Sequence, residues 1–306
     1  MNVTFRQLKV FESVARHLSY TKAAKELYLS QPAVSMQIKQ LEECTGIPLL
    51  QQIGKKTFLT EAGSEMYHYA RSIARELEEA RTIMEQLKGL ESGALEITVA
   101  TTANAFATRM LAMFKQKHEG VSISLDVTNR EHLLRQLAEN EKDIAIMGRP
   151  PIDEDLIAES FAENPLVVVA ACDHPLASKN KITLKTLQNE TFVVREQGSG
   201  TRTAMQRFFD EHNMEITSSM AMNENEAIKQ AVQAGMGLGI VSLHTLELEL
   251  ETKRLVILDV EDFPIMRHWY LVHRKEKRLP PMAQAFKDFV LTEGRELIPS
   301  LIPNIN

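Results

Sequence analysis

The 306-residue chain has only two cysteines, one tryptophan and 6% aromatic residues. Cys44 and Cys172 lie far apart and lack CxxC spacing, so we expect two reduced core thiols; a redox switch is the less favoured alternative. No run of 18 apolar residues is present, which excludes a membrane-spanning helix. The N-terminal sequence MNVTFRQLK lacks the apolar segment of a secretory signal, and this predicts a cytoplasmic protein.

Signatures of common catalytic and metal sites are also missing. Neither a G-x-S-x-G motif nor a P-loop occurs, and the nine histidines show no HxxxH or cysteine-paired spacing. Gly235, Gly237 and Gly239 form a lone GxGxG that follows a predicted helix and precedes a predicted strand, the reverse of a dinucleotide fingerprint. Gly235 is better explained as a helix C-cap. The sequence therefore predicts no catalytic residues, no metal site and no enzyme activity.

Charge is distributed unevenly along the chain. The formal net charge is −6, yet residues 1–60 carry eight Lys/Arg and four acidic residues, so this segment is +4 and the remainder is −10. A basic module joined to an acidic body is typical of a DNA-binding head on a metabolite-binding domain. The length exceeds that of one ordinary core and predicts two or three domains, and the composition, 44% apolar and 25% charged, is that of a soluble globular protein.

Residues 20–46, YTKAAKELYLSQPAVSMQIKQLEECTG, predict a helix, a tight turn at 28–29 and a second helix. Ser30 is placed as the N-cap of the second helix, with Pro32 in its first turn and Gly46 at its end. The apolar positions of this helix point inward, whereas amide and hydroxyl side chains occupy its outer face. Such a helix-turn-helix enters the major groove by the N-terminal end of its second helix. The alternative is a helical hairpin without a DNA role.

Two elements flank this pair. Residues 4–18 begin with a Thr4–Gln7 capping box and predict a helix beneath the DNA-contacting pair. Residues 49–60 predict a β-hairpin with Gly54, Lys55 and Lys56 at its tip. We favour a wing that contacts phosphates over a solvated turn.

Residues 58–90 predict a long helix, and residues 88–93 a hinge. Apolar side chains repeat along the helix with coiled-coil spacing, which favours a partner chain over packing on its own domain. The seam consists of Gly63, Met66, Ala70, Ile73, Leu77, Ala80, Met84 and Leu87.

From residue 95 the pattern changes to alternating strands and helices, which predicts an α/β fold with largely parallel sheets. Crossings near 161–166 and 263–268 would divide this part into two lobes, as in a periplasmic binding protein. The expected strands are 95–100, 121–128, 143–147, 166–172, 192–195, 238–242 and 268–273, and the expected helices are 103–117, 131–138, 201–212, 224–234 and 282–291.

Two loop-to-helix junctions are candidates for an anion site, because each follows a strand and places hydroxyls and free N–H groups at a helix N-terminus. Arg202 would add a charge-assisted contact to a carboxylate or phosphate. The alternative is ordinary helix capping, with Arg202 paired to a local acid. The candidate effector-binding residues are Thr101, Thr102, Asn104, Gln197, Gly198, Ser199, Gly200, Thr201 and Arg202.

The segment SQPAVSMQIKQLE, preceded by FxxVARHLSYTKAAKEL and followed by GIPLL and LTEAG, resembles the N-terminus of LysR-type transcription regulators. The resemblance covers about the first 90 residues and continues more loosely to the end. It implies a winged helix-turn-helix domain at 1–58, a dimerisation and linker helix with a hinge at 59–92, and a two-lobed effector-binding domain at 93–306. Lobe one would comprise about 93–162 and 268–306, and lobe two about 163–267.

The resemblance also implies roles for individual residues. Gln31, Pro32 and Ser35 would contact DNA, and the effector cleft would lie between the two candidate loops. Most members carry arginine where this chain has Met36, and arginine is frequent in the wing where this chain has Gln52, so base preference at both points is open. The complete predicted DNA-binding set is Ser30, Gln31, Pro32, Ser35, Met36, Lys39, Lys55 and Lys56.

The combination VSMQIKQLE, IGKKTFLTEAG and REQGSGTR resembles the subgroup that regulates the RuBisCO (Calvin-cycle) operon, often called CbbR or RbcR. This implies an activator of carbon-fixation genes, with no cofactor but with a phosphorylated metabolite or NADPH as effector. The implied partners are promoter DNA, further copies in a homodimer or homotetramer, and RNA polymerase, without a membrane. Alternatives are a LysR-type regulator of another metabolic operon, a solute-binding module with an added helical N-terminus, and a cleft enzyme for phosphate esters.

Overall fold

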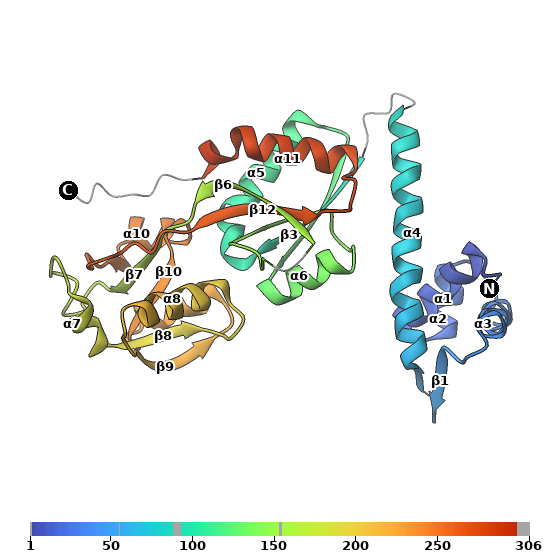
Figure 1. The fold of residues 1–306 in the computed structure, drawn as a ribbon, viewed down its shortest axis with the longest axis horizontal. Helices are drawn as coiled ribbons and strands as arrows, with labels where there is room; N and C mark the ends of the chain where they lie inside the picture. The colour runs from blue at the N-terminus through green and yellow to red at the C-terminus, as the bar shows by residue number, and fades with distance from the viewer. Residues whose placement is uncertain (1, 55, 88–92, 153–154, 299–306) are drawn as a thin grey trace. The chain divides into compact units, whose positions relative to one another are not determined.

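The computed structural model describes residues 2–54, 56–87, 93–152 and 155–298. The chain divides into two compact units, Met1–Leu90 and Glu91–Asn306 (Figure 1). In the described ranges, no helix combines the length and the apolar character needed to cross a membrane. The hinge expected at 88–93 lies, apart from Gly93, outside the described residues.

The first unit begins with three helices, α1 (Phe5–His17), α2 (Tyr20–Glu26) and α3 (Gln31–Thr45). The predicted capping box is present: the Gln7 N–H donates to Thr4 Oγ1 (3.3 Å), and the Thr4 N–H donates to Gln7 Oε1 (2.8 Å). The apolar faces of the three helices meet in one core, in which Phe11, Val14 and Leu41 are fully buried. The predicted helix-turn-helix and its supporting helix are confirmed.

A β-hairpin and a long helix follow. Strands β1 (Leu50–Ile53) and β2 (Lys56–Leu59) pair antiparallel, and α4 spans Glu61–Leu87. The helix therefore begins three residues later than expected, because Phe58 belongs to the hairpin and Thr60 caps the helix, its Oγ1 accepting the Gly63 N–H (2.9 Å). Glycine at 63 allows close packing, since a Cβ there would lie 1.9 Å from the Leu49 carbonyl oxygen.

The predicted seam on α4 separates into two parts. Ala70 is buried and Met66 is partly buried against the core of the first unit, so a partner chain is not needed to cover them. Ile73, Leu77 and Met84 are exposed by 44%, 53% and 57%, and their spacing places them along one side of the helix. The seam prediction is therefore wrong for the first turns of α4; the side chain of Leu87 lies outside the described part.

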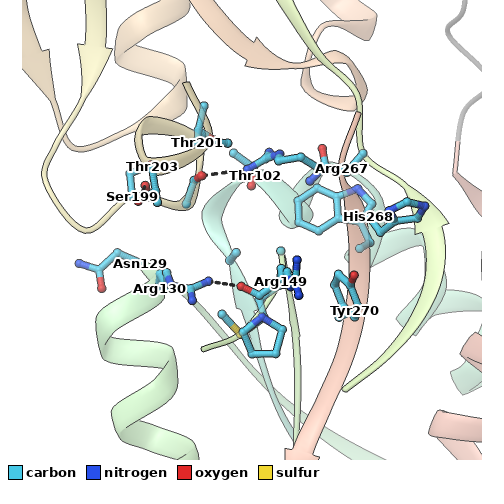
Figure 2. A pocket seen from close by; sticks show the side chains of 18 of the residues that line it. Thr102, Asn129, Arg130, Arg149, Ser199, Thr201, Thr203, Arg267, His268 and Tyr270 are labelled. Atoms are coloured by element: carbon cyan, nitrogen blue, oxygen red, sulfur yellow. Dashed lines mark hydrogen bonds between the residues drawn. The ribbon is translucent and has the colours of Figure 1, made fainter. Parts of the chain in front are cut away.

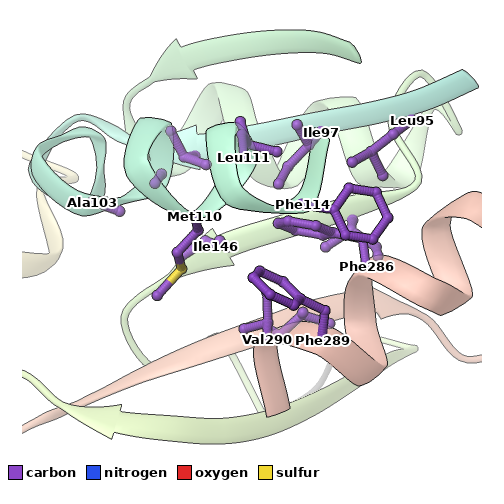
Figure 3. Close-up of a cluster of buried hydrophobic side chains, with 14 of the residues drawn as sticks. Leu95, Ile97, Ala103, Met110, Leu111, Phe114, Ile146, Phe286, Phe289 and Val290 are labelled. Carbon is purple, nitrogen blue, oxygen red and sulfur yellow. The ribbon is translucent and has the colours of Figure 1, made fainter. Parts of the chain in front are cut away.

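Lobe one of the second unit contains a five-stranded sheet in the order β4-β3-β5-β12-β6. Helices α5 and α11 cover one face of it and α6 covers the other. Phe114 of α5 packs against Phe286 and Phe289 of α11 in the larger core (Figure 3). The elements are β3 (Gly93–Ala100), η1 (Thr101–Ala103), α5 (Asn104–Lys117), β4 (Val121–Thr128), α6 (Arg130–Ala138), β5 (Ile144–Met147), β6 (Leu156–Glu163), β12 (His268–Arg274), α11 (Pro281–Glu293) and η3 (Gly294–Leu297).

Lobe two contains a second sheet in the order β11-β7-β10-β8-β9. Helices α7 and α8 pack on one face, and α9 and α10 on the other. The elements are β7 (Leu166–Ala171), α7 (Leu184–Gln188), β8 (Thr191–Arg195), α8 (Gly200–Glu211), β9 (Thr217–Met222), α9 (Asn225–Gln233), β10 (Leu238–Ser242), η2 (Leu243–Thr245), α10 (Glu247–Glu251) and β11 (Leu255–Ile257).

Three further expectations need correction. Both sheets are mixed rather than largely parallel: β12 runs antiparallel to β5 and β6, and β7 runs antiparallel to β10 and β11. Strands β6, β9 and β11 were not predicted. All three are edge strands, and either partly exposed side chains or, for the three-residue β11, short length gives a weak apolar signal. Neither cysteine is a core thiol, since Cys44 is half-buried and Cys172 is exposed immediately after β7.

The chain passes between the two lobes twice, near the predicted crossings at 161–166 and 263–268, and the two connecting segments lie side by side. The Asn164 N–H donates to the Arg267 carbonyl oxygen (2.7 Å), and Leu166 pairs antiparallel with Ile265. Asn164 follows β6 directly, and Arg267 directly precedes β12. These two residues therefore mark the connection between the lobes.

Candidate functional site

The outer face of α3 carries the predicted DNA-contacting side chains. Ser30 is the N-cap, its Oγ accepting the Ala33 N–H (3.3 Å), and Pro32 lies in the first turn. Val34, Ile38 and Leu41 are buried against the other helices. This leaves Gln31, Pro32, Ser35, Met36 and Lys39 exposed on the N-terminal two-thirds of the helix.

The hairpin supplies the remaining predicted contacts. Gly54 has φ +65° at its tip, a conformation that glycine adopts without strain. Lys56 is exposed at the start of β2, whereas Lys55 lies outside the described residues. Lys39 on α3 has its Nζ 3.9 Å from Glu43 Oε1, a distance that leaves the amine exposed to solvent. The exposed amide, hydroxyl and amine groups are those that DNA-binding helices and wings present to bases and phosphates.

A cavity of about 530 Å³ lies between the two lobes of the second unit. It is bordered by the carboxyl ends of β3, β4 and β5, by the N-terminus of α8 and by the two connecting segments. Figure 2 shows two groups of polar side chains on opposite sides of it: Ser199, Thr201 and Thr203 on one side, and Asn129, Arg130 and Arg149 on the other.

The structure brings some of the predicted effector residues to this cavity and leaves others away from it. The two predicted loops do meet there, through Thr101, Thr102, Ser199, Gly200 and Thr201. Asn104, Gln197, Gly198 and Arg202 are not in the lining. The Arg202 guanidinium points back to the end of β8, where its Nη1 donates to the Arg195 carbonyl oxygen (2.8 Å). It therefore stabilises the loop before α8 instead of facing the cavity.

The basic residues that line the cavity were not predicted from the sequence. Arg130 and Arg149 follow β4 and β5, so they share the sheet edge at which Thr101 was predicted, and this order of strands was a usable signal. Arg207 and Arg267 were identifiable only from the three-dimensional structure. Arg195 also lines the cavity but is paired with Glu196, with its Nε 2.7 Å from Glu196 Oε2.

Arg267 is partly buried, and its Nε is fully enclosed. Burial, followed by repulsion from Arg207 and Arg130, lowers the pKa of its guanidinium from its ordinary value to about 10. The group is still charged at pH 7. A buried cation close to other cations favours an anionic ligand, because an anion would offset both the desolvation and the repulsion.

On the far side of Trp269 the lobes touch through uncharged groups. Trp269 Nε1–H donates to His244 Nδ1 (3.2 Å), and Phe106 packs edge-on against both rings. Burial lowers the pKa of His244 to about 4, so the ring is neutral at pH 7, as an acceptor at Nδ1 requires. This contact joins β12 of lobe one to η2 of lobe two beside the cavity.

Comparison with known families assigns both units. Residues 5–64 match the family described as bacterial regulatory helix-turn-helix protein, lysR family. Residues 88–295 match the LysR substrate binding domain. The chain belongs to the LysR family. As a LysR-family protein it is a DNA-binding transcription regulator, and α3 is the second helix of the matched helix-turn-helix segment.

Individual relatives indicate the subgroup of LysR-family regulators that this chain resembles. It is 56% identical over 297 residues to the RuBisCO operon transcriptional regulator of Allochromatium vinosum, covering 97% of this chain and 98% of that one. It is 42% identical, with a TM-score of 0.63, to the regulatory domain of Synechocystis PCC6803 CcmR in complex with 2-PG, covering 65% of this chain and 96% of that one. The resemblance to RuBisCO-operon regulators is thereby confirmed.

The full LysR architecture is shared with more distant proteins. Full-length CbnR complexed with its target DNA has a TM-score of 0.71 at 20% identity, and the match covers 94% of this chain and 98% of CbnR. At that identity the comparison supports the fold alone.

Proposed function

We propose that this LysR-family regulator controls a carbon-fixation (RuBisCO) operon in response to a small phosphorylated acid bound between the lobes. The observation that carries the proposal is the cavity itself, which is lined by Arg130, Arg149, Arg207 and Arg267. Glu196 is the one acidic residue in the described lining, and Arg195 already pairs with it. A CcmR domain 42% identical to this chain binds 2-PG, which agrees with an anionic effector.

The exposed part of α4 supports self-association. Ile73, Leu77 and Met84 form an exposed apolar strip along one side of α4. An apolar strip at this spacing is the seam of a two-stranded coiled coil. We infer a homodimer through α4, and a dimer of dimers at the promoter. Effector-driven closure of the lobes would then change the placement of the heads and the DNA bend, and so the recruitment of RNA polymerase.

The effector assignment predicts a specific stabilisation. Melting curves of the full-length protein are compared with and without 2-phosphoglycolate, 2-phosphoglycerate, phosphoenolpyruvate, ribulose bisphosphate, NADPH and 2-oxoglutarate. A ligand at 100 times its dissociation constant adds about 2.7 kcal/mol, which raises the melting temperature by roughly 5–10 °C for a domain of this size. We expect a phosphorylated acid to give this rise and 2-oxoglutarate to give none. A rise only with NADPH would assign a different effector, and no rise with any compound would contradict the proposal.

A further inference from the structure

We propose that Asn164 and Arg267, on the two segments that connect the lobes, together bind a phosphate group of the effector. The connection between the lobes would thereby sense the ligand's charge directly. This inference rests on the proposed function and deepens it, because it names the group that is recognised and the residues that recognise it. From the sequence these two segments were expected only as the crossings that divide the second unit into lobes.

Asn164 carries a buried donor at the border of the cavity. Its side chain is fully buried, and its Oδ1 accepts the Ser242 hydroxyl (2.8 Å), which fixes the orientation of the amide. Among the described residues no acceptor pairs with its Nδ2, although the residue lines the cavity. A buried amide donor without a partner costs about 1–3 kcal/mol, and a ligand that accepts this hydrogen bond would offset that cost.

Arg267 presents a second such donor from the neighbouring segment. Its Nη1 donates to the Gly200 carbonyl oxygen (3.0 Å), which holds the guanidinium at the start of α8. Its Nε is buried without a partner, and no described carboxylate lies within ion-pairing distance of the guanidinium. Because the Asn164 N–H is bonded to the Arg267 carbonyl, the two unpartnered donors belong to directly paired residues.

The N-terminus of α8 adds donors at the same place. This helix has 12 residues, and the N–H groups of its first turn have no partner within the helix. Ser199 and Thr201 at this end line the cavity with their hydroxyl-bearing side chains, and Figure 2 shows them on the same side as Thr102 and Arg267. Donors that come from a helix end, a guanidinium and an amide suit the three terminal oxygens of a phosphate better than the two of a carboxylate.

Arg130 and Arg149 indicate that the ligand carries a second anionic group. Arg130 and Arg149 lie across the cavity and belong to lobe one, and Arg130 Nη1 donates to the Arg149 carbonyl oxygen (2.6 Å). A ligand whose phosphate contacts the connection and α8 therefore places its other end against lobe one. The geometry assigns the ligand class as a short phosphate monoester with a second anionic group, which would hold the two lobes together.

Calorimetric titration of the full-length protein tests whether Asn164 and Arg267 bind phosphate. The probes are 2-phosphoglycolate, inorganic phosphate and malonate, a dicarboxylate without phosphate. Asn164→Asp keeps the acceptor for Ser242 but replaces the donor with a carboxylate that pairs with Arg267. Arg267→Lys keeps the charge but removes Nε. Each is expected to weaken binding of 2-phosphoglycolate and phosphate at least about 10-fold and binding of malonate less than about 3-fold.

Asn213→Asp is the matched control, because it adds the same charge at an exposed site beyond the opposite end of α8 and should leave all three affinities unchanged. If Asn164→Asp fails to fold, Arg267→Lys still decides the question, since it conserves size and charge. Wild-type affinity for phosphate in the folded variants would overturn the inference and leave the proposed function standing. An equal loss for malonate would overturn the phosphate assignment. No binding of any phosphorylated probe by the wild-type protein would overturn both proposals.

Discussion

Replacing Arg267 with methionine is expected to stabilise the unliganded protein and to remove its response to phosphorylated acids. Burial and repulsion lower the pKa of this guanidinium from its ordinary value to about 10, which corresponds to roughly 3 kcal/mol of destabilisation of the folded state. Loss of the hydrogen bond to the Gly200 carbonyl offsets about 1.5–3 kcal/mol of that gain. We expect a net gain of about 1 kcal/mol, seen as a melting temperature roughly 2–4 °C higher.

The pH dependence of the stability follows from the lowered pKa of Arg267. A cation with a lowered folded-state pKa destabilises the protein fully below that value, and the cost is relieved only between about pH 10 and 12.5. The stability gained by Arg267→Met should therefore be constant between about pH 6 and 9. The ligand response of the wild-type protein should instead weaken below about pH 6, where a phosphate monoester loses its second charge.

Affinity for 2-phosphoglycolate is expected to fall about 100-fold in Arg267→Met, because a buried charge-assisted contact is lost. Arg254→Met provides the control, since it removes one charge from an exposed position in lobe two. It should alter neither the melting temperature nor the ligand response. A destabilised Arg267→Met protein that still binds 2-phosphoglycolate would show that this arginine is structural.

Replacing Gln31 with alanine is expected to weaken binding to the promoter site by about 1–3 kcal/mol, or roughly 10-fold to 100-fold, with little effect on random DNA. Gln31 is the first residue of α3 and is exposed, so its amide is available to a base edge. Its removal should leave the fold intact, because the capping bond belongs to Ser30. Fluorescence anisotropy with the promoter fragment and with a scrambled fragment measures the difference.

Two variants separate base contacts from phosphate contacts in this experiment. Gln40→Ala is the matched control, since Gln40 is also exposed on α3 but nine residues later, on the opposite side of the helix. It should bind both fragments as the wild-type protein does. Lys56→Ala should weaken binding to both fragments and lower the salt slope by about one. An equal loss on both fragments for Gln31→Ala would exclude base recognition by this residue.

The DNA-binding unit was predictable because its determinants are local. The Thr4–Gln7 capping box, Ser30 as N-cap and Gly46 as C-cap act within a few residues, and all three have the predicted roles. The seam on α4 was partly misjudged because periodicity does not distinguish a partner chain from the chain's own core. The close approach of Gly63 to Leu49 and the burial of Ala70 in the first core show which surface covers the first turns.

The effector cavity was predictable where strand ends and a helix N-terminus define it, as Ser199, Gly200 and Thr201 at the start of α8 show. Thr101 and Thr102 follow β3, and both line the cavity as expected for the carboxyl edge of a sheet. Arg202 was a reasonable candidate by position, but its side chain bonds to the Arg195 carbonyl. Arg267 and Asn164 are about one hundred residues apart in the sequence and meet only because the chain crosses between the lobes twice. No local pattern marks such a pair.

The central claim is that occupation of the cavity by a phosphorylated acid changes how the heads engage DNA. The most direct measurement is binding of the full-length protein to the promoter of its RuBisCO operon, with anisotropy and bending followed as 2-phosphoglycolate is added. We predict a ligand-dependent change in affinity or bend for the wild-type protein that Arg267→Met does not show. Identical DNA binding at zero and saturating ligand, with ligand binding verified by calorimetry, would contradict the account.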